Sequence, residues 1–143
     1  MTIPHERWLL DTNIWVFGLR RSTEFPACAE LLDHIGSFSI IIPLQLFREL
    51  NVNLSEDEMH DFYELINQYP DIIEVNWERA SADRIQFFHQ QGCRKGDAVI
   101  AAHAEVLGVK IIVSENRQFL QALEGLPFEI VDAESAVMRL SSE

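Results

Sequence analysis

Three acidic residues of this chain lie far apart in the sequence, yet each borders a segment that can bring it to a shared site. Asp11 ends the short apolar segment 8–10, Glu49 follows Pro43 on an expected helix, and Asp97 begins a run of small residues. Crowded carboxylates repel one another, so a fold tolerates such a cluster only where cations neutralise it. Ligands that offer only oxygen select hard divalent ions such as Mg²⁺ or Mn²⁺. Such ions activate water for attack on a phosphodiester, so hydrolysis is the chemistry that this set favours.

Each of the three acids also has an ordinary structural interpretation. An Asp that follows a strand often caps the next element, and this alternative applies to Asp11. Glu49 would be solvated on the outside of a helix, and Asp97 would interact favourably with the dipole of the helix that it begins. Only the combination of the three, in this order, indicates a metal site.

Strands and helices alternate along the chain. Apolar segments bounded by Gly, Pro or polar residues predict strands at 8–10, 38–42, 72–75, 109–113 and 128–131. Helical spacing predicts helices at 26–35, 44–50, 55–69, 80–90, 98–107, 119–123 and 133–140. The clearest helix start is the capping box of Ser55 and Glu58, whereas we expect a loop after Asp11. This alternation predicts one α/β domain over residues 1–143, a three-layer αβα sandwich around a mostly parallel sheet.

Polar residues follow two of the expected strands directly. Asp11 ends the first strand, and Ser114-Glu115-Asn116 follows the strand at 109–113. In open parallel sheets, ligands bind outside the carboxyl ends of the strands, close to a switch in strand order. We therefore expect these groups to border the site.

Four segments together carry a resemblance to a known family. They are residues 9–13 (LLDTN), 47–50 (FREL), 96–104 (GDAVIAAHA) and 112–119 (IVSENRQF). The chain resembles, over roughly residues 7–132, the PIN-domain family of metal-dependent ribonucleases, which includes the VapC-like toxins of bacterial toxin–antitoxin pairs. The resemblance implies four or five parallel strands with the acids in a groove at one end of the sheet.

The resemblance also implies roles for single residues. Asp11, Glu49 and Asp97 would be the metal-binding and catalytic acids, with Thr12 and Ser114 as their hydroxyl neighbours. The ion would be Mg²⁺ or Mn²⁺.

The fourth acidic position of the family corresponds to Asn116 here, which we include in the catalytic set. Its amide oxygen can ligate Mg²⁺, but it brings no charge and cannot act as a general base. Glu115 is the alternative at this position, so one or two metal ions remain open. Arg117 is a candidate for a phosphate contact.

Charge and cysteine content restrict the other function classes. With 23 Asp and Glu against 11 Lys and Arg, the net charge of −12 argues against sequence-blind adhesion to nucleic acid or anionic membranes. Cys28 and Cys93 have no spacing typical of a zinc site or a disulfide framework. No apolar run is long enough for a membrane span. We expect a cytoplasmic protein.

The sequence thus predicts a Mg²⁺- or Mn²⁺-dependent endoribonuclease that hydrolyses single-stranded RNA. One role that such an enzyme can have is that of the toxin in a toxin–antitoxin pair. The alternative is a catalytically weakened PIN-like domain that binds RNA or protein. The resemblance implies a homodimer and a cognate antitoxin as partners. Trp15 and Phe17 are candidates for base stacking or a partner surface. The segment 43–67 is a candidate interface, with core packing as the alternative for its apolar residues: Leu46, Leu54, Met59 and Phe62.

Overall fold

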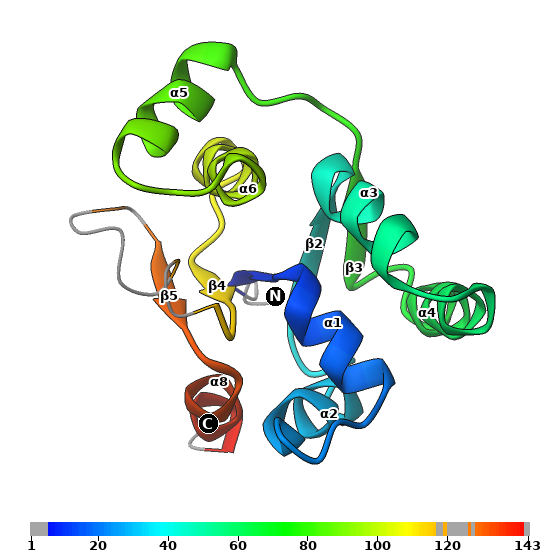
Figure 1. The fold of residues 1–143 in the computed structure, drawn as a ribbon. Coiled ribbons are helices and arrows are strands. Elements are labelled where there is room, and N and C mark those ends of the chain that lie inside the picture. Colours follow the sequence, from blue (N-terminus) through cyan, green and yellow to red (C-terminus); the bar gives the residue numbers. More distant parts are fainter. Residues whose placement is uncertain (1–5, 117–118, 120–125, 127, 142–143) are drawn as a thin grey trace.

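The computed structural model describes residues 6–116, 119, 126 and 128–141, and it places a parallel five-stranded sheet at the centre of the molecule (Figure 1). The strand order is β3-β2-β1-β4-β5. The strands are β1 (Arg7–Leu10), β2 (Ser39–Pro43), β3 (Ile73–Asn76), β4 (Ile111–Val113) and β5 (Glu129–Val131). The first strand, β1, is the central one. β2 and β3 follow on one side of it, and β4 and β5 lie on the other side. The strand order therefore switches between β1 and β4, which is where parallel sheets bind ligands.

Helices cover both faces of the sheet because successive strand residues point to opposite sides. Leu10, Ile42 and Val113 pack under one helical layer, and Leu9 and Ile112 pack under the other. The first layer holds α1 (Thr12–Leu19), α2 (Pro26–Asp33), α3 (Leu44–Asn53), α4 (Glu56–Gln68) and α8 (Ala133–Ser141). The second holds α5 (Ala82–Gln90) and α6 (Lys95–Val106). The predicted three-layer αβα sandwich is confirmed.

The main difference from the sequence-based expectation is α1, which follows β1 with no loop between them. Asp11 is the N-cap of this helix and accepts a hydrogen bond from the backbone N–H of Thr12. The helix was missed because its residues are apolar on nearly all sides and show no helical periodicity. Gly18 lets α1 lie close to α2, since a Cβ at this position would be 2.5 Å from Leu32 Cδ1.

Two other helix starts bear on the prediction. The capping box of Ser55 and Glu58 is present and begins α4. The small-residue helix starts at Lys95 rather than at 98, so Asp97 lies within its first turn. The helix expected at 119–123 lies outside the described residues except for Phe119, which is helical and buried.

Several apolar residues that were candidates for a surface role belong to the core. Trp15 is fully buried and donates its indole N–H to the carbonyl of Leu10, so base stacking by Trp15 is wrong. The four apolar residues named in the segment 43–67 are buried as well, which makes core packing the correct interpretation for them. Cys28 and Cys93 are free and buried. Within the described part of the chain, no helix has the length and apolar character of a membrane span.

Candidate active site

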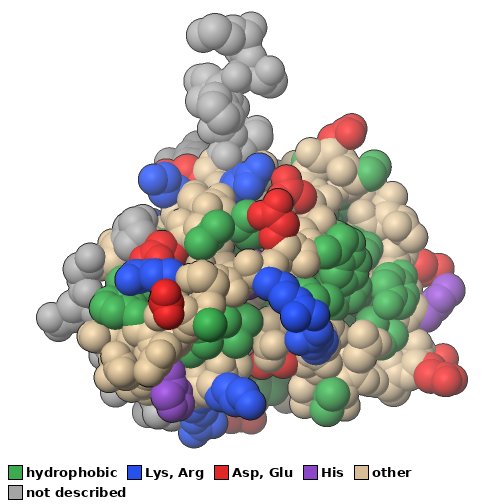
Figure 2. All heavy atoms as spheres, turned by 90° about the horizontal axis from the view of Figure 1, so that it is seen from above, with side chains coloured by type: hydrophobic (Ala, Val, Ile, Leu, Met, Phe, Trp, Pro, Cys, Tyr) green, Lys and Arg blue, Asp and Glu red, His purple; other side chains and the backbone are tan. Residues whose placement is uncertain are grey.

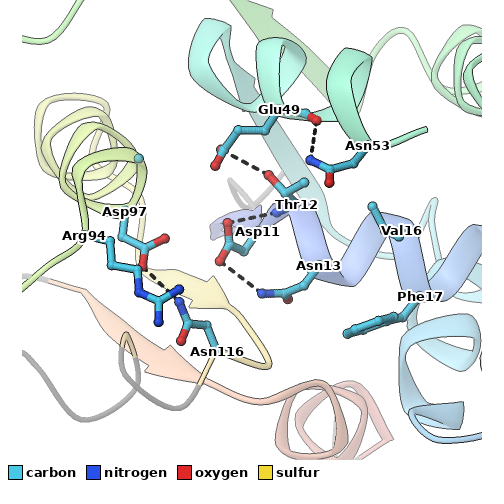
Figure 3. Close-up of a pocket in the computed structure, with 11 residues that line it drawn as sticks. Asp11, Thr12, Asn13, Val16, Phe17, Glu49, Asn53, Arg94, Asp97 and Asn116 are labelled. Atoms are coloured by element: carbon cyan, nitrogen blue, oxygen red, sulfur yellow. Dashed lines mark hydrogen bonds between the residues drawn. The ribbon is translucent and has the colours of Figure 1, made fainter.

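A cleft of about 440 Å³ opens at the carboxyl ends of β1 and β4, between α1, α3 and the first turn of α6 (Figure 3). It brings together the four residues predicted to be catalytic, although they are up to 105 positions apart in the sequence. The lining residues are Asp11, Thr12, Asn13, Val16, Phe17, Glu49, Asn53, Arg94, Gly96, Asp97 and Asn116.

Asp11 lies at the base of this cleft and is almost completely buried, with 3% of its surface exposed. Its carboxylate accepts hydrogen bonds from the Thr12 backbone N–H (2.8 Å), the Ser114 hydroxyl (2.8 Å) and the Asn13 amide (3.4 Å). Burial raises the pKa of Asp11, and these hydrogen bonds partly oppose the rise. All three donors are neutral groups. The buried carboxylate is therefore solvated by the protein but not neutralised by it.

Asn13 and Ser114 join the ends of the two central strands beneath the cleft. The Asn13 side-chain amide donates to Ser114 Oγ at 3.3 Å, and its oxygen accepts from the Glu115 backbone N–H at 3.0 Å. Sequence reasoning quoted Asn13 within a motif but gave it no role. Its polar side chain two residues after Asp11, within the LLDTN motif, is the signal that would have indicated it. Its bonds hold the orientation of Asp11.

Glu49 reaches the cleft from α3 (Figure 3) and is half-buried. The Thr12 hydroxyl donates to Glu49 Oε2 at 3.1 Å, as expected for a hydroxyl neighbour of the acids. A Cβ at Gly96 would lie 3.0 Å from Glu49 Oε1, so the absence of a side chain at Gly96 lets α6 approach α3. Burial, with a further contribution from the charge of Asp11, raises the pKa of Glu49 to about 7.

Asp97 faces the cleft from the first turn of α6 and is 8% exposed. Its Oδ2 accepts a hydrogen bond of 2.9 Å from the side-chain amide of Asn116. Burial and the charge of Asp11 raise the pKa of Asp97 to about 6, although the charge of Arg94 opposes this rise. The shared influence of Asp11 on the other two acids shows that the three carboxylates act on one another electrostatically.

The structure distinguishes Asn116 from Glu115 at the fourth position. Asn116 lines the cleft, and its backbone N–H donates to Ser114 Oγ at 3.1 Å. Glu115 points elsewhere, because its Oε1 accepts a hydrogen bond of 2.9 Å from the backbone N–H of Ala133 at the start of α8. Glu115 does not line the cleft in this structure, and the geometry favours Asn116 at the fourth position. Arg117 lies outside the described residues.

Three further lining residues lie outside the predicted catalytic set, and Phe17 among them was a candidate for base stacking or a partner surface. Phe17 lines one wall, where its ring stacks on Phe25 with centroids 4.5 Å apart. Asn53 donates to the backbone carbonyl of Glu49 at 2.7 Å. Arg94, at the N-cap of α6, is the one cation among the described residues that line the cleft. A cation beside several acids suits a substrate that is itself anionic.

The donors of the cleft fit a hard divalent ion in their chemistry. They are carboxylate, amide and hydroxyl oxygens, and the acids have raised pKa values that a cation would lower. As they stand, no three His, Cys, Asp or Glu side chains of the described residues converge on a single point. Mg²⁺ does not require such a cage, because it usually keeps several waters and binds through one or two carboxylates. Asp11 at the base of the cleft and Asp97 at its wall supply two buried carboxylates that point toward each other (Figure 3).

Comparison with known proteins agrees with this geometry. The sequence model of the PIN domain matches residues 8–124. No curated protein sequence matches the chain. Among solved structures, PAE2754 from Pyrobaculum aerophilum has a TM-score of 0.60 at 17% identity, covering 96% of this chain and 97% of that one.

Two further solved structures share the fold. VapBC2 from Rickettsia felis, bound to a promoter DNA fragment, has a TM-score of 0.56 at 17% identity, with 88% of this chain and 98% of that chain covered. FitAB bound to the IR36 DNA fragment has a TM-score of 0.57 at 12% identity, with coverage of 88% and 94%. At these identities the similarity establishes the arrangement of the chain in space.

Proposed function

The chain belongs to the PIN domain family, and from this premise we propose that it is a Mg²⁺- or Mn²⁺-dependent endoribonuclease that hydrolyses phosphodiester bonds of single-stranded RNA. The observation that carries the proposal is the cleft itself. Asp11 is buried there with only neutral hydrogen-bond donors, and Glu49 and Asp97 lie in the same cleft with raised pKa values. Such a set is stable at neutral pH when a divalent cation neutralises it.

Asp11 and Asp97 would hold the ion, and Glu49 on α3 would be the third acid beside it. When bound, such an ion lowers the pKa of a water molecule and stabilises the charge that develops on phosphodiester oxygens. The protein's own groups orient the acids. Ser114 and Asn13 hold Asp11 in place, and the hydroxyl of Thr12 holds Glu49.

Arg94 and Asn116 line the cleft next to Asp97 (Figure 3), and the substrate would enter beside them. The guanidinium of Arg94 can contact a phosphate of the RNA, and this offsets the repulsion between the acids and the anionic backbone. Asn116 now donates to Asp97 and carries no charge, so the site has three acids in its catalytic set. We therefore assign one well-held ion.

The test is cleavage of single-stranded RNA in Mg²⁺ or Mn²⁺ by the wild type and by Asp11→Asn and Asp97→Asn. The control variant is Asp61→Asn, which removes one negative charge from an exposed position on α4. We expect the two cleft variants to lose cleavage and the control to keep it. If the wild type cleaves no RNA with either metal, or if the cleft variants cleave as well as the control, the proposal fails.

The neutral fourth position favours one alternative, a catalytically weakened domain that binds RNA or protein. An amide in place of an acid removes charge that would help to hold a second ion. This alternative predicts RNA binding in EDTA without cleavage when metal is added. The cleavage assay above separates the two functions.

For partners, the proposed enzyme is a homodimer that is held inactive by a cognate antitoxin in the cytoplasm. The support is the family resemblance together with the fold shared with VapBC2 and FitAB, both of which are bound to a DNA fragment in their structures. Sedimentation of the purified protein tests the dimer. Co-purification with the product of the gene immediately upstream tests the antitoxin, which should be a small DNA-binding protein that suppresses cleavage.

A further inference from the structure

A second depression lies on the other side of α3 from α4, between α3, α5 and α6. It has a volume of about 390 Å³. Its charged lining is mostly basic, with Arg48 on α3, Arg79 before α5, and a single described acid, Glu78. His103 lies at its wall, where the ring nitrogen accepts a hydrogen bond of 3.2 Å from the Ala80 backbone N–H. His103 is therefore engaged in structure, and the exposed charged groups of the depression are the two arginines and Glu78.

Arg48 and Arg79 differ from other arginines of the described chain. Arg20 pairs with Glu58, and Arg84 pairs with Glu105 through two hydrogen bonds. Neither Arg48 nor Arg79 makes an ion pair or a side-chain hydrogen bond with any residue that the structure describes. In a chain with twice as many acids as bases, two neighbouring guanidinium groups without a carboxylate partner form a local site for an anion.

An aromatic surface continues from this depression. Trp77, which follows β3, is 58% exposed, while Trp8 and Trp15 are in the core. The ring centroid of Trp77 lies 5.1 Å from that of Phe47 on α3, and the ring centroid of Tyr63 on α4 lies 6.3 Å from that of Phe47. Phe47 is buried, and its ring packs against one face of the Trp77 ring. This contact holds the orientation of the exposed face of Trp77. Figure 2 shows hydrophobic side chains gathered on this face, next to Lys and Arg side chains.

The depression and the cleft meet at α3. Gln45 lies one turn before Glu49, so both side chains lie on the same side of the helix. The Gln45 amide lines the depression and is 3.6 Å from the Cβ position of Gly96, which lines the cleft. Arg48 lies about 100° further around the helix axis, and Phe47, beneath Trp77, lies another step of about 100° beyond it. A single strand of nucleic acid that crosses α3 would therefore meet the acids, the arginines and Trp77 in that order.

We propose that the outer surface of α3 carries single-stranded RNA away from the cleft, with Arg48 and Arg79 on its phosphates and Trp77 stacked on a base. This inference rests on the proposed function and adds a path for the substrate. Phosphate contacts to arginine and base stacking on an aromatic ring are how single strands are bound without sequence preference. A second copy of this chain fits less well. A twofold interface on this face would bring the two arginines of each copy into one contact area, which would gather four like charges there.

The experiment measures binding of a fluorescein-labelled, unstructured 12-nucleotide RNA to the full chain in EDTA, where no cleavage occurs. We expect Arg48→Gln and Arg79→Gln each to weaken binding several-fold and to reduce the salt dependence, by about 0.7 in log Kd against log salt for each lost phosphate contact. Trp77→Ala should weaken binding on the order of 10-fold, and Trp77→Phe should restore most of it because a ring remains to stack. Because only Trp77 of the three Trp residues is exposed, RNA should also quench its fluorescence in the wild type.

The matched control is Arg139→Gln on α8, which removes the same charge at a distance from α3 (Figure 1). Thermal melting establishes that each variant is folded. The inference is overturned if the two arginine variants bind as Arg139→Gln does, or if RNA leaves the Trp77 fluorescence unchanged. It is also overturned if Trp77→Ala converts a dimer into a monomer in sedimentation without changing RNA affinity, since the surface would then hold a second copy.

Failure of this path is distinguishable from failure of the proposed function. A short RNA that fills only the cleft needs no contact with Trp77. If metal-dependent cleavage is present while Arg48→Gln, Arg79→Gln and Trp77→Ala bind long and short RNA like the wild type, the function stands and the path is wrong. If RNA quenches Trp77 but is not cleaved with any metal, the path stands and the nuclease assignment is wrong.

Discussion

The two sides of α3 differ in the kind of charge that the protein leaves without a partner. Toward the cleft, Asp11 is buried and bonded only to neutral donors. Toward the second depression, Arg48 and Arg79 are exposed and have no carboxylate partner among the described residues. Elsewhere on the surface, arginine and glutamate pair as usual, as Arg84 does with Glu105. The proposed metal site would bring a cation to the first side, and the proposed RNA path would bring phosphate anions to the second.

The two sides also differ in rigidity. The acids are held by a network that joins β1, β4, α1 and α3, in which every described buried polar side-chain atom has a hydrogen-bond partner. The basic side has long side chains at the surface, and only Trp77 is positioned, through Phe47. A site for chemistry requires fixed geometry, whereas a path for a flexible strand tolerates mobile contacts.

The largest expected effect separates chemistry from binding. Asp97→Asn should reduce metal-dependent cleavage by at least about 100-fold, because it removes a proposed metal ligand, an effect at least as large as the loss of an outer-shell partner. It should leave RNA affinity in EDTA unchanged or slightly tighter, since it removes a negative charge from the cleft. For Trp77→Ala, the loss should appear in KM for a long RNA rather than in kcat. Equal losses of kcat in both variants would contradict a division of roles across α3.

A smaller effect is expected on stability in the presence of metal. Mn²⁺ at 100 times its Kd should stabilise the wild type by about 2.7 kcal/mol, which raises the melting temperature by several degrees. Asp97→Asn should lose most of this response, whereas Arg48→Gln should keep it, since Arg48 lies outside the cleft. Thermal melting with and without Mn²⁺ measures both. An unchanged response in Asp97→Asn would place the ion elsewhere.

A pH effect of similar or smaller size should appear without metal. The folded pKa of Asp97, about 6, lies above its ordinary value of 3.8, so the folded state holds more protons than the unfolded state between these values. The free energy of unfolding should therefore fall as the pH rises from about 4 to 7, and Asp97 should contribute up to about 3 kcal/mol of this fall. Glu49, with a pKa of about 7, acts in the same direction.

His103 acts in the opposite direction, because burial lowers its pKa and its contribution to stability grows as the pH rises toward 6.5. Denaturant unfolding gives the free energy of unfolding of the wild type and of Asp97→Asn at each pH in this range. The histidine contribution is common to both proteins and cancels in the difference between these two free energies. The difference between the two should change with pH in the range 4–7. A pH-independent difference would mean that Asp97 has an ordinary pKa in the fold.

The smallest effect should come from Gly96, and it concerns geometry rather than charge. In Gly96→Ala the new methyl group meets Glu49 Oε1 at 3.0 Å, so the carboxylate must move, and cleavage should fall several-fold. Stability should change by less than about 1 kcal/mol, because alanine favours a helix over glycine.

Gly18→Ala is the matched control for this prediction. There the methyl group meets Leu32 Cδ1 at 2.5 Å and the Cys28 carbonyl oxygen at 3.0 Å, so the core must shift. It should lower stability more than Gly96→Ala does. Cleavage and thermal melting of the two variants test whether the two glycines act on the site and on the core respectively.

Much of the fold and of the candidate site is predictable because the signals are local. The alternating apolar segments indicated the parallel sheet, and the capping box of Ser55 and Glu58 marked the start of α4. The three acids were identifiable because each lies in a short motif with a defined place relative to a strand or a helix. The helix α1 was missed since its composition, apolar on nearly all sides, has no periodicity to detect.

The choice between neighbouring residues was settled only by contacts between distant segments. Asn116 faces Asp97 because the turn after β4 brings it to α6, while Glu115, one position earlier, caps α8 instead. Trp15 is buried beneath α4 and Trp77 is exposed beside α3, a distinction that no local pattern carries.

The sequence by itself determined the kind of fold, the family resemblance and the three acids, because these depend on residue types and on spacing along the chain. The tertiary structure decided which groups meet and which remain without a partner. It brings Asp11 from β1, Glu49 from α3 and Asp97 from α6 into one cleft. It also leaves two arginines and Trp77 on the reverse side of α3. Packing of the sheet and its helices fixes these distances, and no local stretch of sequence encodes them.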